Sequence, residues 1–463
     1  MARTTRQTIN ALRRPASVHL HSTQELVAQV ESAAALVDKR RRERGQSTLR
    51  RKPTLHPVVG TKSVTTLELT PWRVLHALAR GYMLSGQGTG HGLAEHWLSL
   101  KFCEALDANR ARSMVLTERG KTPESWYKGM QARELAVGFG LAAAEHIVQQ
   151  RYPDHIISVV DTGIVLRAGW APSVSRRSKS ARPRPDYILE AWKPGEPSKI
   201  TFVACRGNHQ RPTRRSGKTR HTTVQQLVKG AELTEGMQIG DWNTTPSLMI
   251  STELIGQGGI VVNVLESPGH TQLPLRTPGT PGNADDEIKD NPGIPYLNAI
   301  QVPSRGGRRA HRADGFQVGP DDMAWFGQLL ARTGAAGLTA FAGGGPRTAR
   351  YLTAHQGQKY YQVPVFAATS SVDDAELHVG DTKFVGTDHV FRLGSVRVEA
   401  FSGVASELYE LLKDGRVEEY RRATYERSKE GAYTTDERTG PLSLQPDGTA
   451  MALRILPLRQ QRR

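Results

Sequence analysis

The fold of this chain is decided by two stretches, Arg184-Pro185-Asp186-Tyr187-Ile188-Leu189 and Ile200-Thr201-Phe202-Val203-Ala204-Cys205-Arg206-Gly207. Both are short apolar runs bounded by Pro or Gly, which predicts two buried strands. Asp186 opens the first strand and Arg206 closes the second. We expect the two strands to be neighbours in one sheet, with these two side chains at the same edge.

The flanking sequence predicts an alternation of helices and strands around these two stretches. Periodicity and β-branched runs indicate an α-β-β-β-α-β-β order, because apolar segments of strand length alternate with two amphipathic segments of helix length. The expected elements are a helix over 132–150, strands over 156–160, 186–192 and 200–205, a helix over 222–235, and strands over 247–254 and 260–265.

Residues 130–266 resemble the PD-(D/E)xK nuclease superfamily. In that family a helix precedes the sheet, the Asp of a Pro-Asp pair lies on the second strand, and an acidic-x-Lys motif lies on the third. A following helix often carries a Gln, which here is Gln226 in Thr223-Val224-Gln225-Gln226-Leu227-Val228. The resemblance implies a restriction-endonuclease-like mixed-sheet core with catalytic roles for Asp186, Arg206 and Gln226.

The motif of this chain departs from the family pattern at the second strand. Ala204 stands where the acidic ligand is expected, and Arg206 stands where the Lys is expected. Carboxylates of such a site hold Mg²⁺ beside the scissile phosphate, so Mg²⁺ is expected only if the site is active. Asp186 is the implied first ligand. Glu134 matches the position of an auxiliary acid in the family, and Asp161 closes the first strand, so either acid could replace the missing ligand.

Basic residues are concentrated in two parts of the chain. Lys and Arg number 62 against 45 Asp and Glu, a net charge of +17. Residues 1–60 hold 12 Lys or Arg and 4 acids, and residues 167–220 hold 14 and 3, so these two segments account for the whole excess. Such patches favour a polyanionic partner, DNA first. The predicted nucleic-acid-binding residues are Arg176, Arg177, Arg182, Arg184, Arg211, Arg214, Arg215, Lys218 and Arg220.

Cysteine content and hydropathy indicate the compartment. The two cysteines, Cys103 and Cys205, are too few for a disulfide framework or a thiolate zinc cluster. The sequence contains no apolar run long enough for a membrane span and no secretory signal. We therefore expect a cytoplasmic protein without a membrane partner.

Composition predicts five segments and an α/β fold class. The N-terminal domain is expected to be all-helical, and the C-terminal domain to be α+β with strands over 383–401, a helix over 403–422 and a last strand over 450–456. The segments are a basic flexible arm (1–22), the helical N-terminal domain (23–124), the nuclease-like α/β core (125–271), a Pro- and Gly-rich linker or long loop (272–316) and the α+β domain (317–463).

Three functions are compatible with this sequence. The first is a DNA-interacting protein with a degenerate nuclease-like core, which the resemblance places in a bacterial (phage) defence or DNA-processing assembly. The second is an active Mg²⁺-dependent DNA nuclease, a phosphodiesterase with a relocated metal ligand. The third is a structural scaffold subunit whose basic loops contact protein assembly partners. Salt-dependent retention of DNA separates the third from the other two.

Overall fold

The computed structural model describes residues 4–45, 48–49, 55–58, 64–84, 96–169, 184–210, 221–240, 245–256, 258–275, 297–302, 311–352, 373–430 and 440–456. The chain divides into two compact units. We call Val18–Leu67 with Glu124–Ala331 the central unit, and Met1–Ser17, Glu68–Pro123 and Arg332–Arg463 the terminal unit. No helix among these described residues is both long and apolar enough to span a bilayer.

The central unit is a mixed α/β structure built on a curled mixed sheet. Its elements follow the predicted α-β-β-β-α-β-β order, with one short helix and one short strand inserted. They are α6 (Ser125–Arg151), β5 (Ile156–Asp161), α7 (Thr162–Gly169), β6 (Tyr187–Trp192), β7 (Ser198–Asn208), α8 (His221–Glu235), β8 (Met237–Ile239), β9 (Ser247–Glu253) and β10 (Val261–Ser267).

The strands of this sheet lie in the order β2-β1-β10-β9-β7-β6-β5. β5, β6 and β7 form an antiparallel meander, and α8 then carries the chain to β9, which runs parallel to β7. At the other side of the sheet, β1 (Ala16–His21) pairs in parallel with β10. β11 (Gln272–Leu273) pairs with β7. The sheet therefore extends beyond the segment that the sequence predicted.

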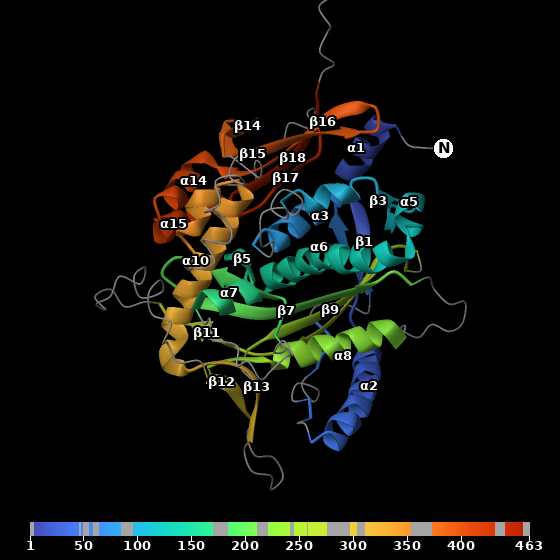
Figure 1. Ribbon diagram of the computed structural model, residues 1–463, viewed down its shortest axis with the longest axis vertical. Coiled ribbons are helices and arrows are strands. Elements are labelled where there is room, and N and C mark those ends of the chain that lie inside the picture. The colour runs from blue at the N-terminus through green and yellow to red at the C-terminus, as the bar shows by residue number, and fades with distance from the viewer. Residues whose placement is uncertain are drawn as a thin grey trace, which may run out of the picture. The chain divides into compact units, whose positions relative to one another are not determined.

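Helices α6 and α8 cover opposite faces of the sheet (Figure 1). Small residues let them approach closely. A Cβ at Gly140 of α6 would lie 2.6 Å from Cys205 Sγ, and a Cβ at Gly230 of α8 would lie 3.6 Å from Ala204 Cβ. Neighbouring residues of β7 thus face different helices, as the pleat of a strand requires. α2 (Gln24–Glu43) packs in turn on α8, with Leu26, Val27 and Val30 in a common core with Leu227.

The first 22 residues do not form the predicted flexible arm. They contain α1 (Thr5–Arg13) and the strand β1. Thr4 and Gln7 form a reciprocal capping box at the start of α1, and alternate residues of β1 are buried. The prediction was wrong because the basic composition of this segment obscures two short but regular patterns.

The segment 23–124 is not all-helical. Besides α3 (Pro71–Tyr82), it contains β2 (Val64–Leu69) and a hairpin of β3 (Leu106–Ala108) and β4 (Met114–Leu116). The chain also changes units within it, near residue 68. Strands of three residues are too short to show an alternating pattern, so the sequence did not reveal them.

Part of the predicted 272–316 linker is also sheet. β12 (Leu297–Val302) pairs with β13 (His311–Val318), and β13 continues parallel to β8. Residues 276–296 and 303–310 lie outside the described residues. The ladder of β13 depends on a partner 79 residues earlier in the chain, since Phe316 pairs with Met237, and local patterns do not reveal such a pairing.

The terminal unit holds the predicted C-terminal strands and helices. Gly415, at φ +81°, separates two helices where one was expected over 403–422. α10 (Met323–Phe341) crosses the boundary between the two units. The sheet order is β14 (Ala375–Val379), β15 (Thr382–Leu393), β16 (Val396–Ala405), β18 (Thr449–Ile455) and β17 (Leu442–Leu444), and the helices are α11 (Gly345–Ala349), α14 (Ser406–Lys413) and α15 (Val417–Lys429).

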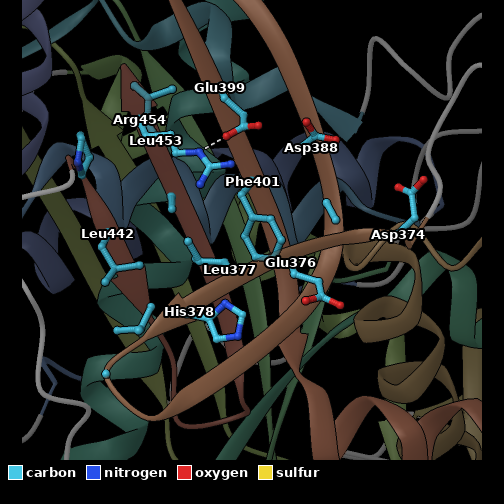
Figure 2. A pocket seen from close by; sticks show the side chains of 15 residues that line it. Asp374, Glu376, Leu377, His378, Asp388, Glu399, Phe401, Leu442, Leu453 and Arg454 are labelled. Carbon is cyan, nitrogen blue, oxygen red and sulfur yellow. Dashed lines mark hydrogen bonds and ion pairs between the residues drawn. The ribbon is translucent and has the colours of Figure 1, made fainter. Parts of the chain in front are cut away.

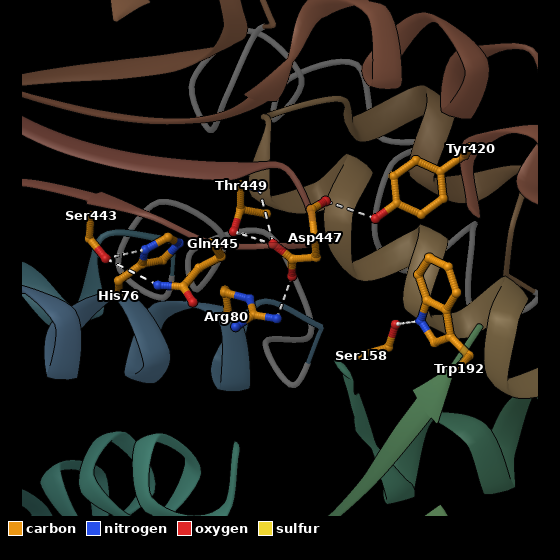
Figure 3. Close-up of polar contacts among 9 residues, drawn as sticks. All are labelled: His76, Arg80, Ser158, Trp192, Tyr420, Ser443, Gln445, Asp447 and Thr449. Atoms are coloured by element: carbon orange, nitrogen blue, oxygen red, sulfur yellow. Dashed lines mark hydrogen bonds and ion pairs between the residues drawn. The ribbon is translucent and has the colours of Figure 1, made fainter. Parts of the chain in front are cut away.

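A buried polar cluster joins α3 to the turn between β17 and β18 in the terminal unit (Figure 3). Arg80 forms an ion pair with Asp447, and both side chains are almost fully buried. Asp447 also accepts a hydrogen bond from the Thr449 hydroxyl at 2.7 Å. One turn earlier on α3, His76 Nδ1 lies 2.9 Å from Ser443 Oγ. Removing one partner of a buried ion pair leaves an uncompensated charge, so this cluster fixes the turn.

Two buried histidines predict an acid-sensitive terminal unit. Burial lowers the pKa of His76 well below 6.5, and it lowers the pKa of His96 to about 4. Both side chains stay neutral in the folded chain, whereas the unfolded chain takes up protons below pH 6.5. We therefore expect the free energy of unfolding to fall from pH 6.5 towards pH 4, by up to about 1.4 kcal/mol per pH unit for each histidine.

Urea unfolding measured at several pH values checks this expectation. His76→Gln and His96→Gln should each flatten the dependence between pH 6.5 and 4, whatever their effect on stability at neutral pH. Identical slopes for both variants and the wild type would show that the histidines are not the groups that take up protons.

Candidate functional site

Asp186 and Arg206 meet at one edge of the central sheet. Asp186 immediately precedes β6, and its N–H donates to the carbonyl of Val203 on β7 at 3.0 Å. Tyr187 pairs with Val203, so the two strands are antiparallel neighbours. Arg206 Nη1 lies 2.8 Å from Asp186 Oδ2. The predicted adjacency of the two strands and of the two side chains is confirmed.

The Asp186 carboxylate is already engaged by this chain. Its Oδ2 accepts hydrogen bonds from Arg206 Nη1 and from the backbone N–H of Cys205, both at 2.8 Å. Burial raises the pKa of Asp186, and the Arg206 guanidinium acts in the opposite direction. The oxygen that a cation would need therefore has two donors from β7, one of them positively charged.

Ala204 lies on the side of β7 that α8 covers. It is fully buried, and the close approach of Gly230 leaves little room beyond its Cβ. The position where the resemblance expects an acid is thus part of the packing between β7 and α8.

Gln226 ties α8 to the ends of two strands. Its Nε2 donates to the Gly207 carbonyl at 2.7 Å, and its Oε1 accepts from Ser251 Oγ at 2.6 Å. Ser251 is the residue of β9 that pairs with Arg206. Gln226 therefore lies at the predicted edge, where its amide group is hydrogen-bonded to the Gly207 carbonyl and to the Ser251 hydroxyl.

Glu134 faces away from the sheet. Ala136 of α6 contacts Gly207, since a Cβ at Gly207 would lie 2.6 Å from Ala136 Cβ. Two residues correspond to about 200° of rotation around an α-helix, which places Glu134 on the far side of α6. The structure therefore does not bring Glu134 to Asp186, contrary to the predicted role as a metal ligand.

Asp161 caps α7. Its Oδ1 accepts the N–H of Ile164 at 2.9 Å, so the carboxylate satisfies the start of that helix. The Arg184 guanidinium lies beside it, because a Cβ at Gly163 would be 3.1 Å from both Arg184 Nη2 and Asp161 Oδ1. This cap and its cationic neighbour explain the carboxylate without a metal.

The residues present do not fit the Mg²⁺ ion that the resemblance implies. Within the described ranges, no three His, Cys, Asp or Glu side chains come together as a group that could hold a metal. Asp186, Glu134 and Asp161 all belong to those ranges, so they form no shared site. Asp186 forms an ion pair with Arg206, and Asp161 caps α7.

The predicted phosphate-contacting residues fall largely outside the described residues. Arg184 is described and half-buried, whereas the other eight lie within 170–183 and 211–220. The ends of the second segment are fixed, since the Thr222 hydroxyl donates to Gln210 Oε1 at 2.8 Å. Gln210 and Thr222, which flank residues 211–220 in the sequence, therefore lie together next to Asn208, at the end of β7 that carries Arg206.

A buried polar network behind this edge was not predicted. Asn208, Thr223, Glu253 and Asn263 are buried, and Thr223 Oγ1 donates to Glu253 Oε1 at 2.6 Å. Asn263 continues the network to His21, whose Nδ1 lies 2.8 Å away. The sequence does place a polar residue near the end of each strand that takes part. These residues can be recognised as one network only when β1 is known to pair with β10.

A separate cleft of about 560 Å³ lies on the sheet of the terminal unit (Figure 2). Phe401 and Leu453 form part of its apolar wall, and Arg454 forms an ion pair with Glu399. Burial raises the pKa of Asp388, and a hydrogen bond with Glu399 raises it further. The carboxylates that line the cleft are Asp374, Glu376, Asp388 and Glu399. This excess of carboxylates over basic side chains disfavours a phosphate backbone in the cleft.

No family model matches the sequence, and neither a curated protein nor a solved structure matches it. The functional inference therefore rests on the residues of this chain and their geometry.

Proposed function

We propose that this chain is a DNA-interacting protein with a degenerate restriction-endonuclease-like core, which binds phosphate at the Asp186–Arg206 edge and does not cleave there. Four features support the restriction-endonuclease-like core. A helix, α6, precedes the meander, Asp186 opens its second strand, and Arg206 lies near the end of its third. The following helix α8 carries Gln226 at the same edge.

The ion pair between Arg206 and Asp186 carries the proposal. A metal-dependent site would have an acid at position 204 to bind the cation and a lysine at 206 to position water. Here a guanidinium pairs with Asp186, the carboxylate that the resemblance makes the first metal ligand. Arg is always charged and presents several donors in one plane, so Arg206 suits phosphate oxygens better than it suits proton transfer.

The distribution of charge supports a nucleic-acid partner at this edge. Residues 167–220 carry 14 Lys or Arg against 3 acids, and both β6 and β7 lie within that range. Contacts of this kind position a phosphate backbone without reading bases. We therefore expect sequence-tolerant and strongly salt-dependent binding.

Incubation of the full chain with plasmid, linear duplex and single-stranded DNA in Mg²⁺ or Mn²⁺ tests the proposal. The DNA affinities of wild type and Asp186→Ala should agree to within about threefold in a gel shift. Phosphate affinity comes from basic residues, and a carboxylate contributes nothing favourable to it. Neither should cut the DNA. Cleavage by the wild type that Asp186→Ala abolishes would replace this proposal with an active nuclease. Absence of any salt-dependent retention would favour a scaffold that binds protein.

A further inference from the structure

The first two turns of α6 expose an apolar stripe that ends at the candidate site. Trp126, Gly129, Met130 and Arg133 follow the i, i+3, i+4, i+7 spacing of one helix face, and all four are exposed. The Trp126 side chain is 73% exposed, and that of Met130 is 38% exposed. A Cβ at Gly129 would meet nothing within 4 Å, so the space beside the indole is open.

The indole has one described aromatic neighbour, which leaves its faces accessible. Tyr127 meets Trp126 edge-on, with ring centroids 5.6 Å apart and an interplanar angle of 80°. An edge-on contact steadies a ring without covering it by stacking. A tryptophan is among the most costly side chains to leave in water, and exposed aromatic patches mark sites of interaction.

The stripe is continuous with the Asp186–Arg206 edge. The next turn of α6 contacts β7, because a Cβ at Gly207 would lie 2.6 Å from the Ala132 carbonyl. Arg133 is near enough to Asp186 to act on the pKa of its carboxyl group. From Trp126 to Arg133 the helix rises by about 10 Å, roughly the span of two or three nucleotides.

The charge along these turns complements a polyanion. Between Ser125 and Arg133 the only charged residues are Lys128 and Arg133, and both are basic. The stripe thus combines an open aromatic face with the cation Arg133, which acts on the pKa of Asp186, the ion-pair partner of Arg206. A base and its phosphate present the matching pair of surfaces, whereas a purely apolar protein partner would leave these cations without a counterpart.

We propose that Trp126 is a stacking platform for an unpaired base, so that single-stranded nucleic acid is the preferred ligand of this edge. This inference rests on the proposed function and adds the ligand class. In a duplex, neighbouring bases already cover each other's faces, and only single strands offer a free face to an indole on a helix surface. Arg133 and Arg206 would then hold the phosphates that follow the stacked base.

Equilibrium binding of the full chain to a labelled single-stranded oligonucleotide, and to the duplex of the same sequence, tests this proposal. Trp126→Ala should weaken single-strand binding about tenfold, which is typical for the loss of one stacked base. Duplex binding should change by less than about twofold. The slope of log Kd against log salt should stay the same, because an indole releases no counterions. Trp126→Phe should retain most of the affinity.

The matched control is Leu36→Ala, which removes another highly exposed apolar side chain of the central unit, 63% exposed on α2. It should change neither Kd. If Trp126→Ala lost affinity equally for the single strand and the duplex, or for neither, the stacking platform would be overturned. Salt-dependent binding by the wild type would in that case still support the proposed function. Self-association of the wild type that Trp126→Ala abolishes in analytical ultracentrifugation would assign the stripe to a second copy of this chain. A wild type that binds no nucleic acid would overturn both proposals.

Discussion

Replacing Arg211, Arg214, Arg215, Lys218 and Arg220 by Ser should reduce the affinity for duplex DNA by orders of magnitude at low salt and flatten its salt dependence. Each phosphate contact contributes about 0.9 to the slope of log K against log salt, so the slope should fall by up to about 4 to 5. The residues that flank this segment in the sequence, Gln210 and Thr222, are hydrogen-bonded to each other near the end of β7 that carries Arg206. A filter-binding titration from 50 to 300 mM salt measures both quantities.

Two controls separate charge from other effects of these substitutions. Changing the four arginines of the segment to lysine preserves the charge and should preserve the slope, since counterion release depends on charge. Removing five basic residues from the end of α2 tests whether any basic run has the same effect. That control replaces Lys39, Arg40, Arg41, Arg42 and Arg44 by Ser. It should lower the DNA affinity and the salt slope less than the 211–220 variant does, which distinguishes the two basic segments. An unchanged slope for the 211–220 variant would show that this segment does not contact phosphate.

Much of the central unit could be predicted because its elements carry their own signals. The β-branched residues of β5 and β10 and the long apolar stretch of α6 are local properties. Thr23 caps α2, and a Ser or Thr before an apolar-periodic stretch is a local start signal for a helix. β1 and the β12–β13 hairpin were missed because their stability depends on partners far away in sequence. Strand pairing of this kind is a tertiary property that composition cannot show.

The candidate site was predictable in position and less so in chemistry. Asp186, Arg206 and Gln226 could be placed at one edge because strand alternation and a Pro-Asp boundary determine where they lie. The role of Glu134 depends on the rotation of α6 against the sheet, which Gly140 and Ala136 determine through close packing. The sequence did not show that a helix, α7, begins directly after β5 and that the Asp161 carboxylate caps it.

Introducing the missing acid by Ala204→Glu should destabilise the central unit by about 3 to 5 kcal/mol at pH 8, the cost of an unpaired buried charge. From the sequence alone, Ala204→Glu with Arg206→Lys would be expected to rebuild a metal site beside Asp186. The structure changes that expectation, because Ala204 is fully buried and α8 approaches it at Gly230. A glutamate there has to enter the packed layer between sheet and helix. Chemical denaturation of the variant measures the loss.

The pH dependence of stability, compared between Ala204→Glu and the neutral variant Ala204→Gln, separates the effect of the buried charge from the effect of the added side-chain volume. Ala204→Gln adds the same bulk without a charge, so its stability should vary with pH as that of the wild type does. Burial raises the pKa of a carboxyl group, so the Ala204→Glu variant should lose further stability as the pH rises from 4 to 8. Mg²⁺ should raise the Tm of neither variant. A Tm that Mg²⁺ raises only in the Ala204→Glu, Arg206→Lys double variant would show that the new carboxylate reaches Asp186, and the packing of β7 against α8 would then not be what excludes a metal from this edge.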